Sequence, residues 1–521
     1  MLVSVRSVSL RLVSAGPLLV LCLALIAIKA FFLWLDPTVR FYLGDSAAYL
    51  YGAMDDGRLP DDRSFTYSFL IRALVRPFDG LLAILPWQAL AGIGIALVLY
   101  LALRRYLQVP QMLAAGAACL LAIEPAQLFY ERMVLAETFG LLWFVLFYLA
   151  AAAYLASGRA AWLPIVAAVG LLAATFRLNY LPVVLVISVG LPVMHGVLAW
   201  PTPRRPLLSH VALAVCAVVV THVGYRAWVA AIFESPPGYV ARAGFMQLGL
   251  VLPLVRAEHL ERVGLPRDFA AELEHSISDP AARMRHMWAP GGFVRELRDR
   301  KINVEPIARE LSRMAVKDDP LGLVRLGVGT VGDYFTAEGI EQALDNDLGR
   351  RAIPPEILWS LREEWNYDAS GVPTKVTVVS RYFEVGTWWL VACLFLLLPL
   401  SVLNAGVHWR TPQRAQAVLA ALFGIGLVLA HVLFVPVAFY RYLHPLPFFV
   451  LLDAIALAGR RPALFIVQRL DRIELRGFRR RVHPEHEPYG DRHRERQHQR
   501  QRGDDRGPAG KARDGARHHD S

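Results

Sequence analysis

Long runs of apolar residues restrict what this chain can fold into more than any other feature of its sequence. A helix needs about 20 apolar residues to cross the hydrocarbon core of a bilayer, and several runs here approach that length with few or no charges. At 55% hydrophobic residues, the chain is also richer in them than ordinary soluble domains. Backbone groups inside a bilayer must satisfy their hydrogen bonds within the segment, so these runs are expected to be helices. The predicted fold class is therefore all-α, a polytopic bundle of transmembrane helices.

Ten segments of the chain qualify as candidate membrane spans. They cover residues 17–35, 81–103, 112–128, 139–155, 161–176, 181–199, 207–232, 385–403, 417–437 and 446–458. Two of them are short. The span over 161–176 would need Arg177 to reach the interface or a polar cavity. The span over 446–458 would need to begin earlier or to be buried in protein.

The positions of Lys and Arg in the short connections predict the orientation of the bundle. Cytoplasmic loops of membrane proteins carry an excess of these residues. If all ten spans are real, the basic residues beside them fall on one side of the membrane: Arg6, Arg11, Arg104, Arg105, Arg159, Arg204, Arg205, Arg410, Arg414, Arg460 and Arg461. This side is assigned to the cytoplasm. The prediction is a bacterial inner-membrane protein with both termini inside the cell.

The predicted topology divides the chain into four parts. Residues 1–233 form an N-terminal transmembrane module, 234–381 an extracytoplasmic helical loop domain, 382–460 the C-terminal transmembrane helices, and 461–521 a basic, disordered cytoplasmic tail. The second part mixes charges of both signs with several prolines and is too polar to span. Its stretch over 319–339 has an amphipathic pattern and could lie on the membrane surface.

The C-terminal tail supplies most of the net charge. From Arg460 to Ser521 there are 17 Lys/Arg and 10 Asp/Glu, which contributes +7 to the net +11. Such a composition is typical of a solvated, disordered segment. Attraction to anionic lipid or nucleic acid is the alternative interpretation.

The first outer loop contains an acid directly after a glycine. Asp45 follows Gly44 and precedes a stretch, 46–54, that could form a short interfacial helix. The glycine would let the chain turn just before the acid. Two interpretations stay open: Asp45 caps that helix, or it is a catalytic carboxylate at the outer surface.

The second outer connection, over 124–138, is rich in charge. Glu137 begins the fourth span, where a carboxylate suits the positive end of the helix dipole. Glu131 and Arg132 could form a surface pair of little energetic weight. Together with Glu124, however, these residues place three acids and an arginine at one membrane surface, which also suits a polar reaction centre.

Charged residues also interrupt or follow apolar runs elsewhere. Arg177 lies between the fifth and sixth spans and Lys29 lies within the first, and such charges are costly without a partner. Arg177 either reaches lipid phosphate at the interface or binds a specific phosphate, for which its planar fork is suited. The segment 440–445 (Tyr-Arg-Tyr-Leu-His-Pro) has the composition of an interfacial aromatic belt. There His444 is either structural or, as the less favoured alternative, a metal or proton site.

In their order and topology these motifs resemble the GT-C superfamily of integral-membrane glycosyltransferases. The chain is most similar to the branch of protein O-mannosyltransferases, aminoarabinose transferases and bacterial family 39 enzymes. The features that match are Gly44-Asp45-Ser46 with Tyr49, Leu135-Ala136-Glu137, Arg177-Leu178-Asn179-Tyr180, Arg441-Tyr442-Leu443-His444-Pro445 and the long loop after the seventh span. The resemblance covers about Pro17 to Arg461. It departs at Ser46, where many relatives carry a second acid.

The resemblance implies a GT-C-like fold with one larger extracytoplasmic loop domain, and a polyprenyl-phosphate sugar as donor. An acceptor hydroxyl of an envelope glycan, lipid or protein would attack the anomeric carbon, and the lipid phosphate would leave. Asp45 and Glu137 are then expected to be catalytic. Asp45 would be the general base, with a pKa raised in a partly dry cleft. Arg177 and Arg441 would bind the donor phosphate.

Further expectations concern substrate contacts, cofactors and partners. Tyr49, Arg132, Tyr442 and His444 are expected to bind substrate. No metal ligand is predicted and the cofactor is unknown, since a divalent metal is compatible with the sequence but not required by it. The expected partners are the lipid-linked sugar, its acceptor and membrane lipids, and no nucleic acid. Asp345-Asn346-Asp347 matches the Asp-x-Asp of soluble glycosyltransferases, but a turn is predicted there because short motifs match by chance.

A transporter or flippase of a lipid-linked or envelope substrate is the main alternative function. Transporters place charged residues near the bilayer midplane and often show repeated halves. Here the polar groups lie at the outer ends of the spans and the two halves differ. A non-enzymatic assembly or sensor protein is the second alternative, since the tail and the long loop could both bind partners.

Overall fold

Helices make up nearly all the regular structure of the protein. The computed structural model describes residues 15–42, 44–78, 80–198, 205–267, 283–288 and 291–460. Within these ranges there is no β-strand, and the one β-bridge joins Arg40 to Met133. The all-α prediction is confirmed for these ranges. The chain up to Arg460 forms one unit, while the predicted tail, 461–521, falls in a second unit that lies outside the described residues.

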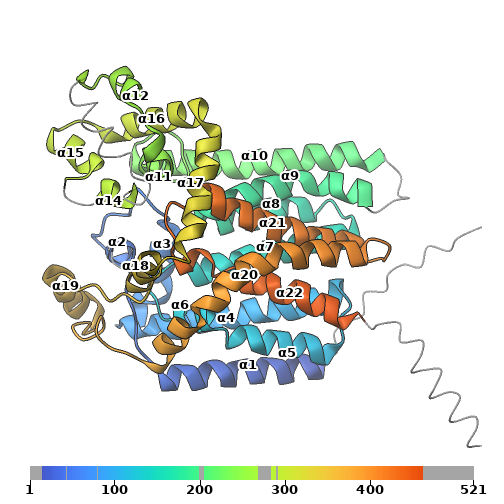
Figure 1. Ribbon diagram of the computed structural model, residues 1–521. Helices are drawn as coiled ribbons and strands as arrows, with labels where there is room; N and C mark the ends of the chain where they lie inside the picture. Colours follow the sequence, from blue (N-terminus) through green and yellow to red (C-terminus); the bar gives the residue numbers. More distant parts are fainter. Residues whose placement is uncertain are drawn as a thin grey trace, which may run out of the picture. The chain divides into compact units, whose positions relative to one another are not determined.

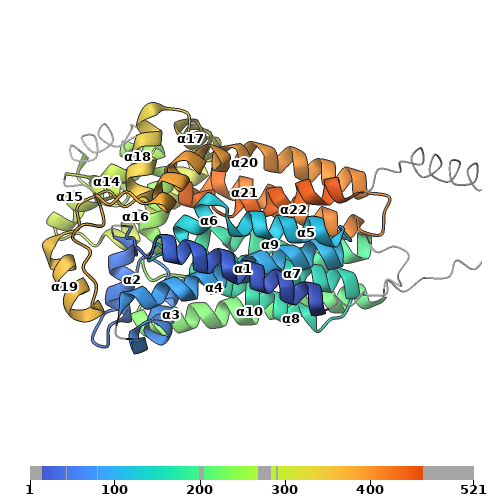
Figure 2. The same cartoon turned by 90° about the horizontal axis from the view of Figure 1, so that it is seen from below.

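In the part of the chain that the structure describes, seven helical segments are long and apolar enough to cross a membrane. They contain α1 (Ala15–Leu35), α4 (Ile84–Leu101, preceded by η2, Leu81–Ala83, and continued by η3, Ala102–Tyr106), α7 (Glu137–Ser157), α9 (Leu181–Leu198, preceded by η4, Leu178–Tyr180), α10 (Arg205–Phe233), α20 (Val378–His408) and α21 (Arg414–Phe434). Both views show these helices running alongside one another (Figure 1, Figure 2). Their length and composition indicate a membrane protein.

The three other predicted spans coincide with shorter helices. These are α5 (Gln111–Ala122), α8 (Trp162–Phe176) and α22 (Leu446–Gly459), of 12, 15 and 14 residues. Each is shorter than the roughly 20 residues that a straight crossing requires. They nevertheless pack inside the bundle, α8 against α7 and α10, and α22 against α20 and α21. Seven of the ten predicted spans are thus supported by length.

The prediction of one continuous helix over 112–128 is wrong. The α5 helix ends at Ala122, and α6 (Pro125–Tyr130) begins after an extended Glu124. A residue before proline avoids the helical region, and proline itself suits the first turn of a helix. The Glu124 side chain then accepts the Gln127 backbone N–H at 2.6 Å, as an N-cap does. The sequence Glu-Pro therefore turns an apparent span into two helices.

The remaining helices gather at one end of the bundle, on the left in Figure 1. They are α2 (Asp45–Ala53), α3 (Thr66–Leu74), α11 (Ala243–Val251), α12 (Ala257–Arg262), α14 (Arg283–Trp288), α15 (Phe293–Asp299), α16 (Val304–Asp318), α17 (Pro320–Asp333), α18 (Ala337–Asp347) and α19 (Pro355–Trp365), with the short turns η1 (Arg76–Phe78), η5 (Leu252–Leu254) and η7 (Tyr440–Tyr442). Four of them, α11 and α14–α16, supply most of a second cluster of buried apolar residues separate from the core of the bundle. This part of the chain therefore has a small core of its own.

The stretch predicted to be amphipathic, 319–339, contains α17. Asp319 caps this helix by accepting the Gly322 N–H at 2.7 Å. Leu326 is buried, whereas Leu321 and Val328 are exposed. The helix packs against α21, and an added Cβ at Gly327 would meet the Val432 carbonyl oxygen. That it lies on a membrane surface stays a prediction.

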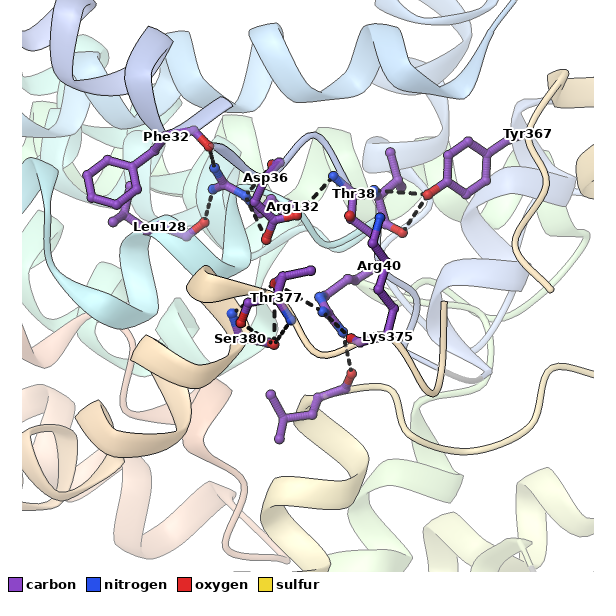
Figure 3. A network of polar contacts seen from close by, with 12 residues as sticks. Phe32, Asp36, Thr38, Arg40, Leu128, Arg132, Tyr367, Lys375, Thr377 and Ser380 are labelled. Atoms are coloured by element: carbon purple, nitrogen blue, oxygen red, sulfur yellow. Dashed lines mark hydrogen bonds and ion pairs between the residues drawn. The ribbon is translucent and has the colours of Figure 1, made fainter. Parts of the chain in front are cut away.

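Two buried arginines attach the loop between α1 and α2 to the bundle (Figure 3). Arg132 donates to the carbonyl oxygens of Phe32 at 2.6 Å, Asp36 at 3.0 Å and Leu128 at 2.5 Å. The first two carbonyls belong to the end of α1 and the residue after it, where helical C=O groups lack partners within the helix. The predicted surface pair of Glu131 and Arg132 is therefore wrong, since both side chains are buried.

Arg40 connects three distant parts of the chain. Its backbone N–H donates to the Arg132 carbonyl at 2.8 Å and its carbonyl accepts the Val134 N–H at 3.0 Å. Its guanidinium donates to the carbonyls of Leu348 at 3.3 Å and Lys375 at 2.9 Å. The loop before Asp45 is thereby fixed both to the connection that precedes Glu137 and to the segment that follows α18.

Candidate functional site

A cavity of about 760 Å³ lies where the end-of-bundle helices meet the bundle. Residues of α2, α7, α11 and α18 line it, together with the α8–α9 connection and the segment that joins α21 to α22. Its charged lining residues are Asp45, Asp62, Arg63, Glu137, Arg177, Arg351 and Arg441. Another part of the wall is apolar and includes Phe176, Leu178, Phe245, Met246, Leu250 and Phe434. The cavity thus combines a charged side with an apolar side.

Asp45 enters this cavity from the first turn of α2. Gly44 precedes it with φ +86°, a backbone conformation that a residue with a Cβ rarely adopts. Ser46 fixes the start of the helix, because its hydroxyl accepts the Tyr42 N–H at 2.7 Å and donates to the Val134 carbonyl at 2.9 Å. Ser46 therefore holds the backbone beside Asp45.

Two arginines bind the Asp45 carboxylate. Arg63 Nη1 lies 2.5 Å from Oδ1, and Arg441 Nη1 lies 2.6 Å from Oδ2. Burial alone would raise the pKa of Asp45, but the guanidiniums of Arg441 and Arg63 outweigh it and the pKa is lowered. The expectation of a raised pKa for Asp45 is therefore wrong. Asp45 is also not the helix cap, since Gly44 is the N-cap of α2 and Asp45 is the first residue of the helix.

Glu137 joins the two predicted phosphate-binding arginines. It occupies the first turn of α7, and Arg177 Nη1 donates to its Oε1. Arg441 Nη1 lies 3.7 Å from the same oxygen. One continuous chain of ion pairs therefore runs along the cavity, in the order Asp45, Arg441, Glu137 and Arg177. Its members come from distant parts of the sequence.

Aromatic rings hold the guanidiniums from the other side. The Arg441 guanidinium carbon lies 4.0 Å from the centroid of the Tyr42 ring and 5.1 Å from that of Tyr442. Arg177 lies 5.4 Å from the same Tyr442 ring. Such contacts stabilise a cation and restrict its orientation. Tyr442 and Tyr49, both predicted to bind substrate, line the cavity.

Arg132 and His444, the other two residues predicted to bind substrate, do not line the cavity. The Arg132 guanidinium donates instead to the backbone carbonyls of Phe32, Asp36 and Leu128. His444 is buried behind the cavity, with Nε2 3.0 Å from the Gln127 Oε1. Burial, aided by the charges of Arg177 and Lys29, lowers the pKa of His444 to about 3. It is therefore neutral at physiological pH.

Sequence reasoning missed several residues of the site. Arg63 lies in a loop with many acids and arginines, where no spacing distinguishes it. Asn346 also lines the cavity, and Asp347, next to it, is fully buried. The turn predicted for 345–347 is wrong, because these residues are the last three of α18. The Asp-x-Asp match therefore marked residues at the cavity, although they form the end of a helix.

A protein metal site usually places several carboxylate, imidazole or thiolate groups around one metal ion. Within the described ranges, no group of three or more His, Cys, Asp or Glu side chains is placed to hold one. Asp45 and Glu137 are each bound by guanidiniums instead.

Comparison of the chain with protein-family models, with curated proteins and with solved structures finds no match.

Proposed function

We propose that this protein is a membrane glycosyltransferase that transfers a sugar from a polyprenyl-phosphate donor to an acceptor in the cell envelope. The observation that carries the proposal is the ion-pair chain of Asp45, Arg441, Glu137 and Arg177 along one cavity. The resemblance to the GT-C superfamily is independent support, because it selects these same four residues from the order of the motifs.

The donor phosphate is assigned to Arg177 and Arg441. Both guanidiniums share the Glu137 carboxylate, so a phosphate that approaches them competes for donors that are already oriented. Planar guanidiniums bind phosphate oxygens through paired hydrogen bonds. The apolar wall beside them, with Phe176 and Leu178, suits the first isoprene units of a lipid.

The reaction needs one base and one stabilised leaving group. The acceptor hydroxyl oxygen attacks the anomeric carbon of the sugar, and its proton passes to the Asp45 carboxylate. The bond between the anomeric carbon and the phosphate oxygen breaks, and the electron pair stays on the lipid phosphate. Arg177 and Arg441 stabilise the charge that develops there. The products are the glycosylated acceptor and the free lipid phosphate, which can take the proton from Asp45.

Donor binding would also strengthen the base. In the unliganded cavity Asp45 is ionised but weakly basic, because Arg441 and Arg63 lower its pKa. A phosphate that draws the Arg441 guanidinium toward itself weakens one of these two contacts. The pKa of Asp45 then rises toward the range of an effective general base. Glu137 orients Arg177 and Arg441 throughout.

This function goes with a definite membrane topology. We propose ten spans in a bacterial inner membrane, with α5, α8 and α22 as the three short ones, and both termini in the cytoplasm. The cavity then opens on the extracytoplasmic face, and 234–381 forms the outer loop domain. Membrane lipids, the donor and an envelope glycan, lipid or protein are the partners.

The proposal is tested in a strain that lacks the gene. Loss of one envelope glycan together with accumulation of one lipid-linked sugar supports it, and identifies donor and acceptor. The wild-type gene should restore the glycan, and so should the variant Asp55→Asn, which changes an exposed acid just after α2. Asp45→Asn should insert normally and fail to restore it. Movement of a lipid-linked sugar across vesicles with no transfer would instead identify a transporter.

A further inference from the structure

The last turn of α18 carries a carboxylate that the proposed mechanism does not use. Asp347 is fully buried, and its Oδ2 accepts the backbone N–H of Tyr440 at 2.7 Å. Tyr440 is the neighbour of Arg441, which binds Asp45. Asp45 and Asp347 are 302 positions apart in the chain. Both contact the same short segment, since Asp347 binds Tyr440 and Asp45 binds Arg441.

The segment that carries Arg441 has a second anchor close by. The Tyr334 hydroxyl, at the end of α17, donates to the Phe439 carbonyl at 2.9 Å. Tyr334 is itself buried. The C=O and the N–H of the Phe439–Tyr440 peptide are thus both bound by buried side chains of the 234–381 segment. A 3-10 turn of three residues such as η7 has little stability without such contacts.

We propose that Asp347 is a positioning residue that holds the backbone of η7, so that Arg441 faces both Asp45 and the donor phosphate. The effect of Asp347 on sugar transfer rests on the proposed function, but its contact with the η7 backbone does not. A carboxylate that accepts a backbone N–H forms a stronger bond than a neutral acceptor. Loss of this acceptor leaves the Tyr440 N–H buried and unpaired, which favours a shift of the segment.

The neighbouring residues supply matched controls. Asp345 lies two positions earlier on the same helix, about half exposed, with Arg350 Nη1 3.5 Å from its Oδ1. Replacing it by Asn changes the same charge without touching η7. Asp347→Asn keeps an oxygen that can accept the Tyr440 N–H, whereas Asp347→Ala removes it. A graded effect, with Ala larger than Asn, is therefore expected.

The direct test measures the reactivity of Arg441 in the purified, full-length protein. Phenylglyoxal modification, followed by mass spectrometry, reports how often each arginine is accessible. In the wild type Arg441 is only 11% exposed. Asp347→Ala should raise its modification rate roughly tenfold, the size of effect that one charge-assisted hydrogen bond supplies. Asp347→Asn should raise it less, and Asp345→Asn should leave it unchanged.

Arg132 serves as the internal reference for unfolding. Its side chain is 1% exposed and lies in a different network. A variant that merely loosens the fold would raise the modification of Arg132 as well as that of Arg441. Equal Arg441 rates in the wild type and Asp347→Ala, or parallel increases at both arginines, would overturn the proposal. Tyr334→Phe, which removes the other anchor, gives the same readout if Asp347→Ala cannot be purified.

A binding measurement separates this inference from the proposed function. Farnesyl phosphate and farnesol differ only in the phosphate, so Asp347→Ala should weaken binding of the first and leave the second unchanged. If the wild type does not bind farnesyl phosphate, the proposed donor is wrong. The Arg441 modification rate still decides the role of Asp347 in that case.

Discussion

The same end of the bundle contains two buried groups of charges that behave differently. In the network behind the cavity, Lys29 Nζ lies 2.7 Å from Glu131 Oε1 and also donates to the Ala122 carbonyl at 2.7 Å. Gln127 donates to the same Glu131 oxygen at 2.8 Å. Neither of these two charged side chains lines the cavity. In the cavity, by contrast, Asp45 and Arg441 are paired and still face open space.

The comparison shows that burial of a charge does not by itself identify a reactive site. Even the space beside Glu131 is filled, since a Cβ added at Gly92 would lie only 1.8 Å from its Oε1. A closed network of this kind fixes helices relative to one another, and its members have no capacity for a ligand. Residues in the open group keep one side free, so a phosphate or hydroxyl can replace a protein partner.

The largest contrast is expected from Asp45→Asn. This variant should lose transfer activity by about 10²–10⁴-fold, the range that a general base contributes. Its thermal unfolding should fall only modestly, because Asp45 is partly exposed and Asn keeps one oxygen that accepts from Arg63 or Arg441. Transfer assays with purified protein and the donor that accumulates in the deletion strain measure it. Activity within a factor of two of wild type would remove Asp45 from the mechanism.

The closed network should respond in the opposite way. Lys29→Met leaves Glu131 buried without its cation and should destabilise the fold by about 3–5 kcal/mol. The double variant Lys29→Met/Glu131→Leu should recover part of that loss, since no lone charge remains. Unfolding midpoints in detergent compare the three proteins. Equal midpoints for the single and double variants would show that the pair contributes no coupling.

A pH series sharpens the difference between paired and unpaired carboxylates. Burial raises the pKa of Asp347 from 3.8 to about 7, although Arg441 and the Tyr440 N–H oppose it. Because the pKa is higher in the folded state, its contribution to stability is present below about pH 4 and is lost as the pH rises through about 7. Asp347→Asn should therefore gain stability relative to wild type between pH 5 and 8, on the order of 2 kcal/mol. A stability difference that is flat over this range contradicts the shift.

The smallest effect is expected at Tyr442. Tyr442→Phe keeps the ring beside Arg177 and Arg441, and should change the KM for the donor less than about threefold. Tyr442→Ala removes the ring and should raise that KM about tenfold, as a cation–π contact of 1–2 kcal/mol requires. Similar KM values for Phe and Ala would mean that the ring does not hold the arginines.

The parts of the fold that depend on local pattern were predictable from the sequence. The spans at α1, α7 and α21 follow from apolar runs alone, and Gly44 before Asp45 correctly suggested a turn at the start of a helix. The break at Glu124 was missed, although Glu-Pro is a local signal. It was hidden by the apolar residues on both sides.

The parts that depend on partners could not be predicted. Arg132 and Arg177 both lie beside apolar helices, and nothing in their neighbours separates them. Arg132 became structural because the end of α1 brings free carbonyls to it, whereas Arg177 meets Glu137 at an open cavity. Of the two arginines that bind Asp45, Arg441 is 396 positions away in the chain. Such pairings are decided by tertiary packing, which a single sequence does not specify.

The long separation between partners has a consequence for how the protein is made. When Arg40 leaves the ribosome, its acceptors at Leu348 and Lys375 have not been synthesised, and Asp45 has to wait for Arg441. Contacts this distant along the chain form late in folding. The cavity therefore lacks part of its lining until the segment between α21 and α22 has been synthesised. A product that ends before Arg441 carries Asp45 and Glu137 without one of the arginines that bind them.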